Sequence, residues 1–142
     1  RSAAGGEEDP DLLMLQQGNA YYLGRRIMKS LFGAVFHGVQ GACVDPNNPS
    51  SFRARKGSQY HIAVKRSSLA HMRHTPQENV FREVSVMRYL SAGAGHPYVM
   101  PLVDACITST HIYVVTPFCP GGDLLKSVKP QEGTGEDKAR RW

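Results

Sequence analysis

Apolar and polar residues alternate along residues 21–40, which is the pattern of half-buried β-strands. Glycines interrupt this stretch at Gly24, Gly33 and Gly38, so it predicts two strands joined by a turn. Short runs rich in β-branched residues predict three further strands, over residues 60–65, 100–107 and 111–118. Together these runs predict a sheet of five strands.

A helical pattern separates the third predicted strand from the fourth. Apolar side chains recur there at helical spacing, at Val80, Val84 and Met87. This periodicity predicts a helix over residues 76–90, and Thr75 followed by Glu78 forms a capping box at its start. Shorter helices are predicted over residues 123–128 and 136–142. The order of elements predicts an α+β fold, a five-stranded antiparallel sheet with one helix packed on a face.

Two stretches lack these patterns. Residues 1–20 begin with glycine, alanine and acidic residues, and they are predicted to be a flexible N-terminal segment. Residues 41–59 contain a cluster of turn-forming residues followed by basic ones, and they are predicted to be an inserted, mobile surface loop. Residues 21–142 are therefore predicted to form one domain around a single core.

The composition is that of a globular protein, since 41% of the 142 residues are hydrophobic and 20% are charged. No apolar run approaches the roughly 18 residues that span a membrane, so no membrane segment is predicted. The net charge of +5 is modest. Nucleic-acid binding is an alternative that rests on the basic residues Arg53, Arg55, Lys56, Lys65 and Arg66. A solvated loop is the favoured interpretation of this cluster, and nucleic acid is not an expected partner.

The three cysteines and six histidines show no spacing typical of a disulfide framework or a zinc site. We therefore expect reduced thiols, no metal ligands, and an intracellular protein, cytoplasmic or nuclear. The first residue is Arg and no signal-like segment follows it, so the sequence is interpreted as a fragment or processed piece of a longer protein.

One pair of charged residues is a candidate for phosphate chemistry. Lys65 ends the third predicted strand, and Glu83 lies on the apolar face of the predicted helix. A lysine on a sheet that faces a carboxylate on a covering helix can form an ion pair, which would fix the ammonium where phosphate oxygens could meet it. Taken singly, an ordinary strand end is the favoured interpretation of Lys65, and a solvated helix position is the favoured interpretation of Glu83.

Five segments in a fixed order resemble the N-terminal lobe of the eukaryotic protein kinases. Residues 27–35 match the glycine-rich loop of that family, and Ile62-Ala63-Val64-Lys65 resembles its Val-Ala-Ile-Lys strand. The other three segments resemble its regulatory helix, the His-Pro-Asn-Ile segment and the hinge, and they are residues 81–90, 96–102 and 113–124. Gly121-Gly122-Asp123-Leu124 favours the serine/threonine class. The resemblance implies the small lobe, the hinge and the beginning of the large lobe.

The resemblance also implies roles for single residues. Lys65 would hold the α- and β-phosphates of ATP, and Glu83 would orient Lys65. The glycine-rich loop would cover the nucleotide with Ile27, Met28, Lys29, Ser30, Leu31, Phe32, Gly33, Ala34 and Val35. The adenine pocket would use Ile27, Val35 and Ala63 as its roof, Thr116 as gatekeeper, and the Pro117 carbonyl and Cys119 N–H as hinge contacts. Asp123 would reach the ribose or a basic residue of a peptide substrate.

Two departures from the family pattern limit these expectations. Met28 and Ser30 stand where the first two glycines of the loop are usual, which leaves a nucleotide-binding or interaction module without catalysis, a pseudokinase, as the alternative. The catalytic loop and the Asp-Phe-Gly metal site are not among these 142 residues. We therefore expect a parent protein that transfers the γ-phosphate of ATP to protein Ser/Thr with Mg²⁺, whose ligands lie beyond residue 142, and a fragment that is inactive alone.

Overall fold

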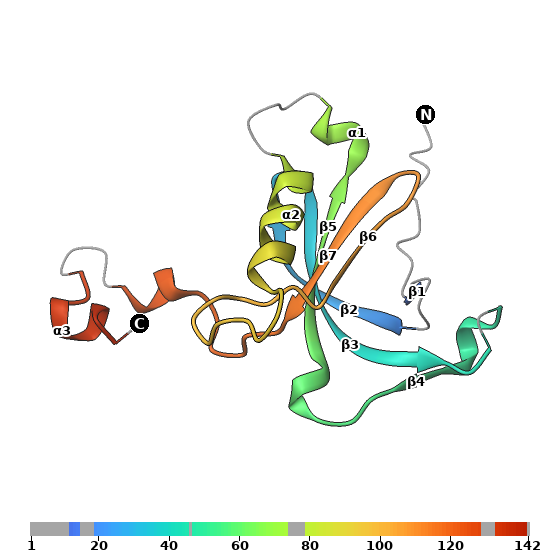
Figure 1. The fold of residues 1–142 in the computed structure, drawn as a ribbon, viewed down its shortest axis with the longest axis horizontal. Coiled ribbons are helices and arrows are strands. Elements are labelled where there is room, and N and C mark those ends of the chain that lie inside the picture. Colours follow the sequence, from blue (N-terminus) through green and yellow to red (C-terminus); the bar gives the residue numbers. More distant parts are fainter. Residues whose placement is uncertain (1–11, 15–18, 46, 74–78, 129–132, 142) are drawn as a thin grey trace, which may run out of the picture.

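The computed structural model describes residues 12–14, 19–45, 47–73, 79–128 and 133–141 (Figure 1). Its centre is one antiparallel sheet with the strand order β1-β2-β3-β5-β7-β6, in which β4 pairs with β3 beside this path. The strands are β1 (Leu12–Met14), β2 (Asn19–Ser30), β3 (Gly33–Cys43), β4 (Phe52–Ala54), β5 (His61–Ser68), β6 (Asp104–Ile107) and β7 (His111–Pro117). The α+β class is confirmed, and the sheet has seven strands where five were expected.

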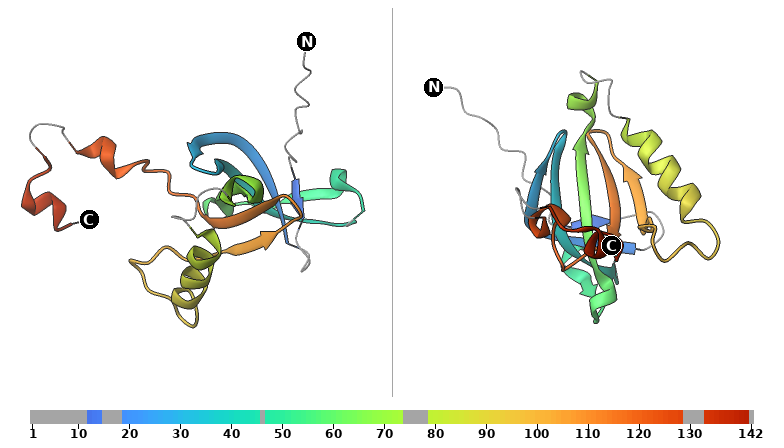
Figure 2. Two further views of the ribbon diagram at one scale, coloured as in Figure 1. Left: turned by 90° about the horizontal axis from the view of Figure 1, so that it is seen from above. Right: turned by 90° about the vertical axis from the view of Figure 1, so that its left-hand side faces the viewer.

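The helices lie mostly on one side of this sheet. They are α1 (Leu69–Met72), α2 (Val80–Leu90) and α3 (Glu136–Ala139), with 3-10 turns η1 (Pro49–Ser51), η2 (Ser58–Tyr60) and η3 (Leu124–Ser127). Helix α2 runs alongside the sheet, whereas α3 lies at the end of the C-terminal segment, away from the strands (Figures 1 and 2). In the described part of the chain no helix is long and apolar enough to cross a membrane.

The first additional strand falls within the segment that was expected to be flexible. Residues Leu12–Met14 form β1, which pairs antiparallel with residues 20–22 of β2. Leu13 is buried in the core of the sheet. This short apolar cluster forms a strand because β2 would otherwise leave one edge without hydrogen-bond partners.

The second additional strand falls within residues 41–59, which were expected to form an inserted loop. Strand β3 continues to Cys43, and β4 returns along it to form a hairpin that projects from the sheet (Figure 1). Gly41 permits this pairing, because a Cβ atom there would lie 2.4 Å from the Arg53 carbonyl oxygen. The ring of Phe52 also packs near that of Tyr22, with centroids 6.3 Å apart. Residues 41–43 and 52–54 are therefore paired in the sheet, and the expectation that the remainder is a mobile insertion stays a prediction.

Alternation along the strands divides the apolar side chains into two clusters. One cluster fills one face of the curled sheet and contains Leu13, Tyr21, Leu23, Ala34, Phe36, Ile62, Val64, Tyr113 and Val115. The other lies between the opposite face and α2 and contains Phe32, Val80, Val84, Ile112 and Val114. Met87 and Leu102 pack against this second cluster. The helix is thus held by its apolar stripe, as its periodicity predicted.

Helix α2 begins later than the sequence pattern suggested. Its first residue is Val80, and the Asn79 side chain caps it by accepting a hydrogen bond from the Arg82 N–H at 3.1 Å. The expected capping box of Thr75 and Glu78, with Pro76, lies outside the described residues. The short helix α1 forms in a stretch for which the sequence pattern predicted no helix or strand.

A long-range hydrogen bond joins two strands that are far apart in the sheet order. The Tyr21 hydroxyl on β2 donates to Asp104 Oδ2 on β6 at 2.9 Å, across 83 residues of sequence. Because β3, β5 and β7 lie between these strands, the sheet must curl to bring the two groups together. Tyr21 is fully buried. Burial, followed by the hydrogen bond to Asp104, raises the pKa of Tyr21 well above its ordinary value.

Tyr21→Phe is expected to lower the free energy of unfolding by about 1.5–3 kcal/mol, because it removes a hydrogen bond to a carboxylate. Above about pH 10 an unfolded tyrosine loses its proton while folded Tyr21 keeps it, so the wild type should lose stability as pH rises. This alkaline loss should be smaller in Tyr21→Phe. Urea denaturation between pH 7 and 11 measures it, with Tyr98→Phe as control because Tyr98 is 88% exposed. Identical pH profiles for wild type and Tyr21→Phe would contradict the prediction.

Candidate functional site

Lys65 and Glu83 form the predicted ion pair. The Lys65 ammonium lies 2.8 Å from Glu83 Oε2 and 3.2 Å from Glu83 Oε1, so it contacts both carboxylate oxygens. Strand β5 supplies the lysine and α2 supplies the glutamate. The two side chains are 29% and 39% exposed, which means that the pair stands at the edge of the core and remains open to solvent.

The strand register places the expected adenine-site residues on one face of the sheet. Val35 on β3, Lys65 on β5 and Val114 on β7 are paired in one row across the strands. The next row on the same face pairs His37 with Ala63 and Ala63 with Thr116. Side chains two residues apart on a strand share a face. Val35, Ala63, Lys65 and Thr116 therefore lie on the face against which α2 packs.

Residues 27–35 form a tight hairpin. Ser30 on β2 pairs with Gly33 on β3, so Leu31 and Phe32 make the turn. Gly33 is needed at this point, because a Cβ atom would lie 2.2 Å from the Arg66 carbonyl oxygen of β5. Along β2, the expected roof residue Ile27 lies at a register irregularity and is exposed, as are Met28 and Lys29.

The two turn residues point in opposite directions. Leu31 is 65% exposed, whereas Phe32 is 2% exposed and packs in the cluster between the sheet and α2. The Phe32 carbonyl also accepts a hydrogen bond from the Ser68 N–H at 2.9 Å. The structure thus separates Phe32 from the other loop residues and makes it an anchor between the hairpin and the helix.

The predicted hinge follows β7. Thr116 and Pro117 end this strand, and both are partly buried. The Phe118 N–H donates to the His61 carbonyl at 3.0 Å, which ties the segment to β5. Cys119 and Asp123 are exposed. The Asp123 carboxylate caps η3 by accepting a hydrogen bond from the Leu125 N–H at 2.9 Å, so it stabilises the start of this 3-10 turn.

The residues around Lys65 fit the phosphate end of a nucleotide. A cationic Lys65 is fixed beside a partly open sheet face, which suits phosphate oxygens. Among the described residues no group of three His, Cys, Asp or Glu side chains is placed to hold a metal. Magnesium is accordingly assigned no ligand in this part of the chain.

The sequence reasoning missed a histidine pair beside the hinge. His37 Nε2 on β3 lies 2.9 Å from His61 Nδ1 on β5, and the Phe118 ring contacts His37 with centroids 4.3 Å apart. Partial burial lowers the pKa of His37, and the nearby His61 and Arg25 add to this effect. Linear spacing could not reveal the pair, because it depends on the register between two strands.

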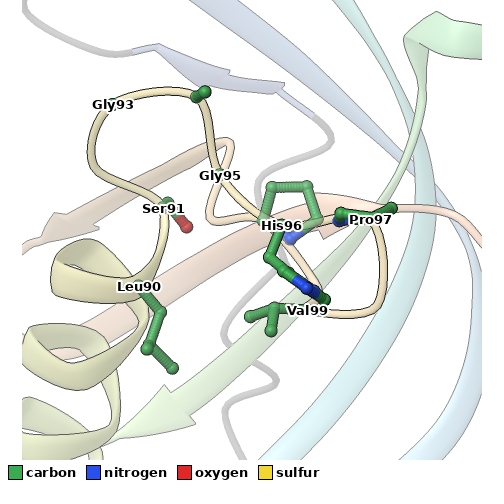
Figure 3. Close-up of a pocket in the computed structure, with 9 residues that line it drawn as sticks. Leu90, Ser91, Gly93, Gly95, His96, Pro97 and Val99 are labelled. Carbon is green, nitrogen blue, oxygen red and sulfur yellow. The ribbon is translucent and has the colours of Figure 1, made fainter.

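A separate pocket of about 480 Å³ lies at the end of α2, in the loop that leads to β6 (Figure 3). Leu90, Ser91, His96, Pro97, Val99 and Pro101 line much of it. The Ser91 hydroxyl accepts a hydrogen bond from the Leu102 N–H at 2.7 Å and so holds the end of this loop. None of the predicted site residues lines this pocket.

The three cysteines are unpaired, as expected. Burial, assisted by Asp104, raises the pKa of the Cys106 thiol to about 11, so this thiol is protonated at neutral pH. Cys119 is the exposed one.

Comparison with known proteins finds similarity to protein kinases. The family model described as "Protein kinase domain" matches residues 50–142. CDPK-related kinase 3 of Arabidopsis thaliana is 32% identical over 127 residues, which cover 87% of this chain and 18% of that protein. Serine/threonine-protein kinase atg1 of Aspergillus clavatus is 28% identical over 81 residues, covering 57% of this chain and 8% of that protein. The chain therefore spans less than a fifth of the length of these relatives, and it belongs to the protein kinase domain family.

Proposed function

We propose that residues 21–142 are the nucleotide-binding lobe, hinge and first part of the large lobe of an ATP-dependent protein kinase that phosphorylates serine or threonine. The ion pair between Lys65 and Glu83 carries this proposal. It fixes one ammonium group on the sheet face that also presents Val35 and Ala63. Relatives named as serine/threonine-protein kinases support the substrate class.

The chemistry that this lobe would supply is positioning and charge. Lys65 would hold the α- and β-phosphates, and Glu83 would keep the ammonium in place. Val35, Ala63 and Thr116 would contact the adenine, whose edge would bond to the Pro117 carbonyl and the Cys119 N–H. Magnesium, when bound, would neutralise phosphate charge through ligands beyond residue 142.

A pseudokinase is the second candidate, and the hairpin favours it. Met28 and Ser30 occupy positions where glycine would let backbone N–H groups approach phosphate closely. The Ser30 hydroxyl is buried and has no hydrogen-bond partner in the described part of the chain. A hairpin anchored through Phe32 and built with these side chains would hold nucleotide less closely.

Two measurements distinguish the candidates. Transfer of radiolabelled γ-phosphate to a protein substrate is measured on the natural protein that contains this lobe, and Mg-ATP binding is measured by calorimetry. We expect transfer to serine or threonine by that protein, and very weak Mg-ATP binding without transfer by the 142-residue chain. Binding without transfer by the natural protein would favour the pseudokinase, and the absence of both would contradict both candidates.

A further inference from the structure

The pair formed by His37 and His61 has a geometry that neither the fold nor the proposed function requires. The rings are inclined by only 13°, and their centroids are 5.1 Å apart. The contact between His37 Nε2 and His61 Nδ1 is 2.9 Å. The centroid separation nearly equals the nitrogen–nitrogen contact plus the distance from each ring centre to its contacting nitrogen. The two ring centres and the two nitrogens therefore lie almost on one line. The rings therefore meet edge to edge in nearly one plane, with one proton between two nitrogens.

The strands fix this arrangement. In the antiparallel register His37 lies opposite Ala63, and His61 lies opposite Val39, so the two histidines are diagonal neighbours on one face. The Phe118 ring covers one side of His37, and the Phe118 N–H is bonded to the His61 carbonyl. Both backbones are thus held, while the rings can still turn about their broad terminal torsions.

We propose that His37 and His61 form a two-imidazole site for a divalent transition-metal ion of the zinc and copper class, which replaces the shared proton and joins β3 to β5 beside the hinge. Imidazole nitrogen is the ligand that these ions prefer among neutral side chains. Two bonds of about 2.0–2.1 Å at a tetrahedral angle need nitrogens about 3.3 Å apart. The nitrogens would move apart by a few tenths of an ångström, and each ring would also turn so that its lone pair points at the ion instead of at the other nitrogen. Water would complete the coordination, since His61 is exposed.

One nearby charge opposes the ion, and it provides a test. Arg25 is close enough for its guanidinium to act on His37. A positive charge near His37 repels a second cation. Removing it should therefore strengthen metal binding, whereas a change that merely disturbed the surface would not.

The experiment uses the metal-free 142-residue chain and titrates ZnCl₂, CuCl₂ and NiCl₂ separately, by calorimetry and by thermal unfolding. We expect each ion to raise the melting temperature, with Cu²⁺ binding most tightly. His37→Gln and His61→Gln should each weaken Zn²⁺ binding at least tenfold, and the double variant should behave like the single ones. His71→Gln is the matched control, because His71 is an exposed histidine on α1. Arg25→Gln should tighten binding severalfold, with Arg53→Gln as its control.

Imidazole NMR signals of the unsubstituted chain provide a measurement that does not depend on any variant folding. The ring signals of His37 and His61 should shift on addition of ZnCl₂, and those of His71 should not. The proposal is overturned if no ion binds at millimolar concentration, or if the double variant binds Zn²⁺ as tightly as the wild type. Either result would mean that the pair is a hydrogen bond only.

Discussion

Replacing Lys65 by methionine is expected to lower phosphoryl transfer by the protein that contains this lobe by about 10²–10³-fold, the usual effect of removing one preorganised electrostatic contact. The ammonium that Glu83 holds at 2.8 Å would be lost, and methionine offers no charge to the phosphates. The initial rate of γ-phosphate transfer at saturating Mg-ATP measures this effect. Glu83→Gln should give a smaller loss, because it leaves the ammonium present but less firmly placed.

Unfolding of the Lys65→Met variant cannot explain this loss of transfer, because the ion pair is partly exposed to solvent. With side chains 29% and 39% exposed, the pair should contribute less than about 1 kcal/mol to stability. Lys56→Met is the matched control, because Lys56 is an exposed lysine after β4, outside the proposed site. Unchanged transfer in Lys65→Met would show that this lysine does not act on the phosphates.

Phe32→Ala is expected to lower the free energy of unfolding by about 3–5 kcal/mol, because it removes a buried aromatic side chain and leaves a cavity. The lost contacts join the hairpin over residues 27–35 to Val80 and Val84 of α2. Since the free energy of unfolding of small domains is about 5–15 kcal/mol, this single change removes a large part of it. Urea denaturation followed by circular dichroism measures it.

The neighbouring turn residue supplies the control for this prediction. Leu31 is 65% exposed, so Leu31→Ala should change stability by no more than about 0.5 kcal/mol. Phe32→Leu keeps most of the buried volume and should cost less than about 1.5 kcal/mol, which provides a folded variant for comparison. Equal effects of Leu31→Ala and Phe32→Ala would mean that the phenylalanine does not anchor the hairpin.

Local patterns were sufficient to predict the main strands and the apolar stripe of α2. Alternation over residues 21–40 predicted β2 and β3, and the spacing of Val80, Val84 and Met87 predicted the face that packs on the sheet. The ion pair between Lys65 and Glu83 was found because a family resemblance joined two residues that are unremarkable singly. The roles assigned to the hinge residues and to Asp123 stay predictions.

The features that were missed depend on contacts between distant segments. Strand β1 is too short to show alternation, and it exists because β2 offers an edge. Strand β4 lies in a polar, basic stretch whose backbone pairing leaves no hydrophobic pattern. Whether Phe32 points outward or toward α2 is decided by tertiary packing, which no local pattern encodes.

The curl that joins Tyr21 to Asp104 also constrains how this lobe can fold during synthesis on the ribosome. The hairpin of β2 and β3 emerges before β5 and β7, and β5 has no partner on its other edge until β7 arrives. Strand β7 ends only at Pro117. Such non-local pairing gives a high contact order and slow folding. The nascent chain therefore exposes the apolar faces of β2, β3 and β5 while about fifty more residues are added, and exposed apolar surface of this kind is prone to aggregation.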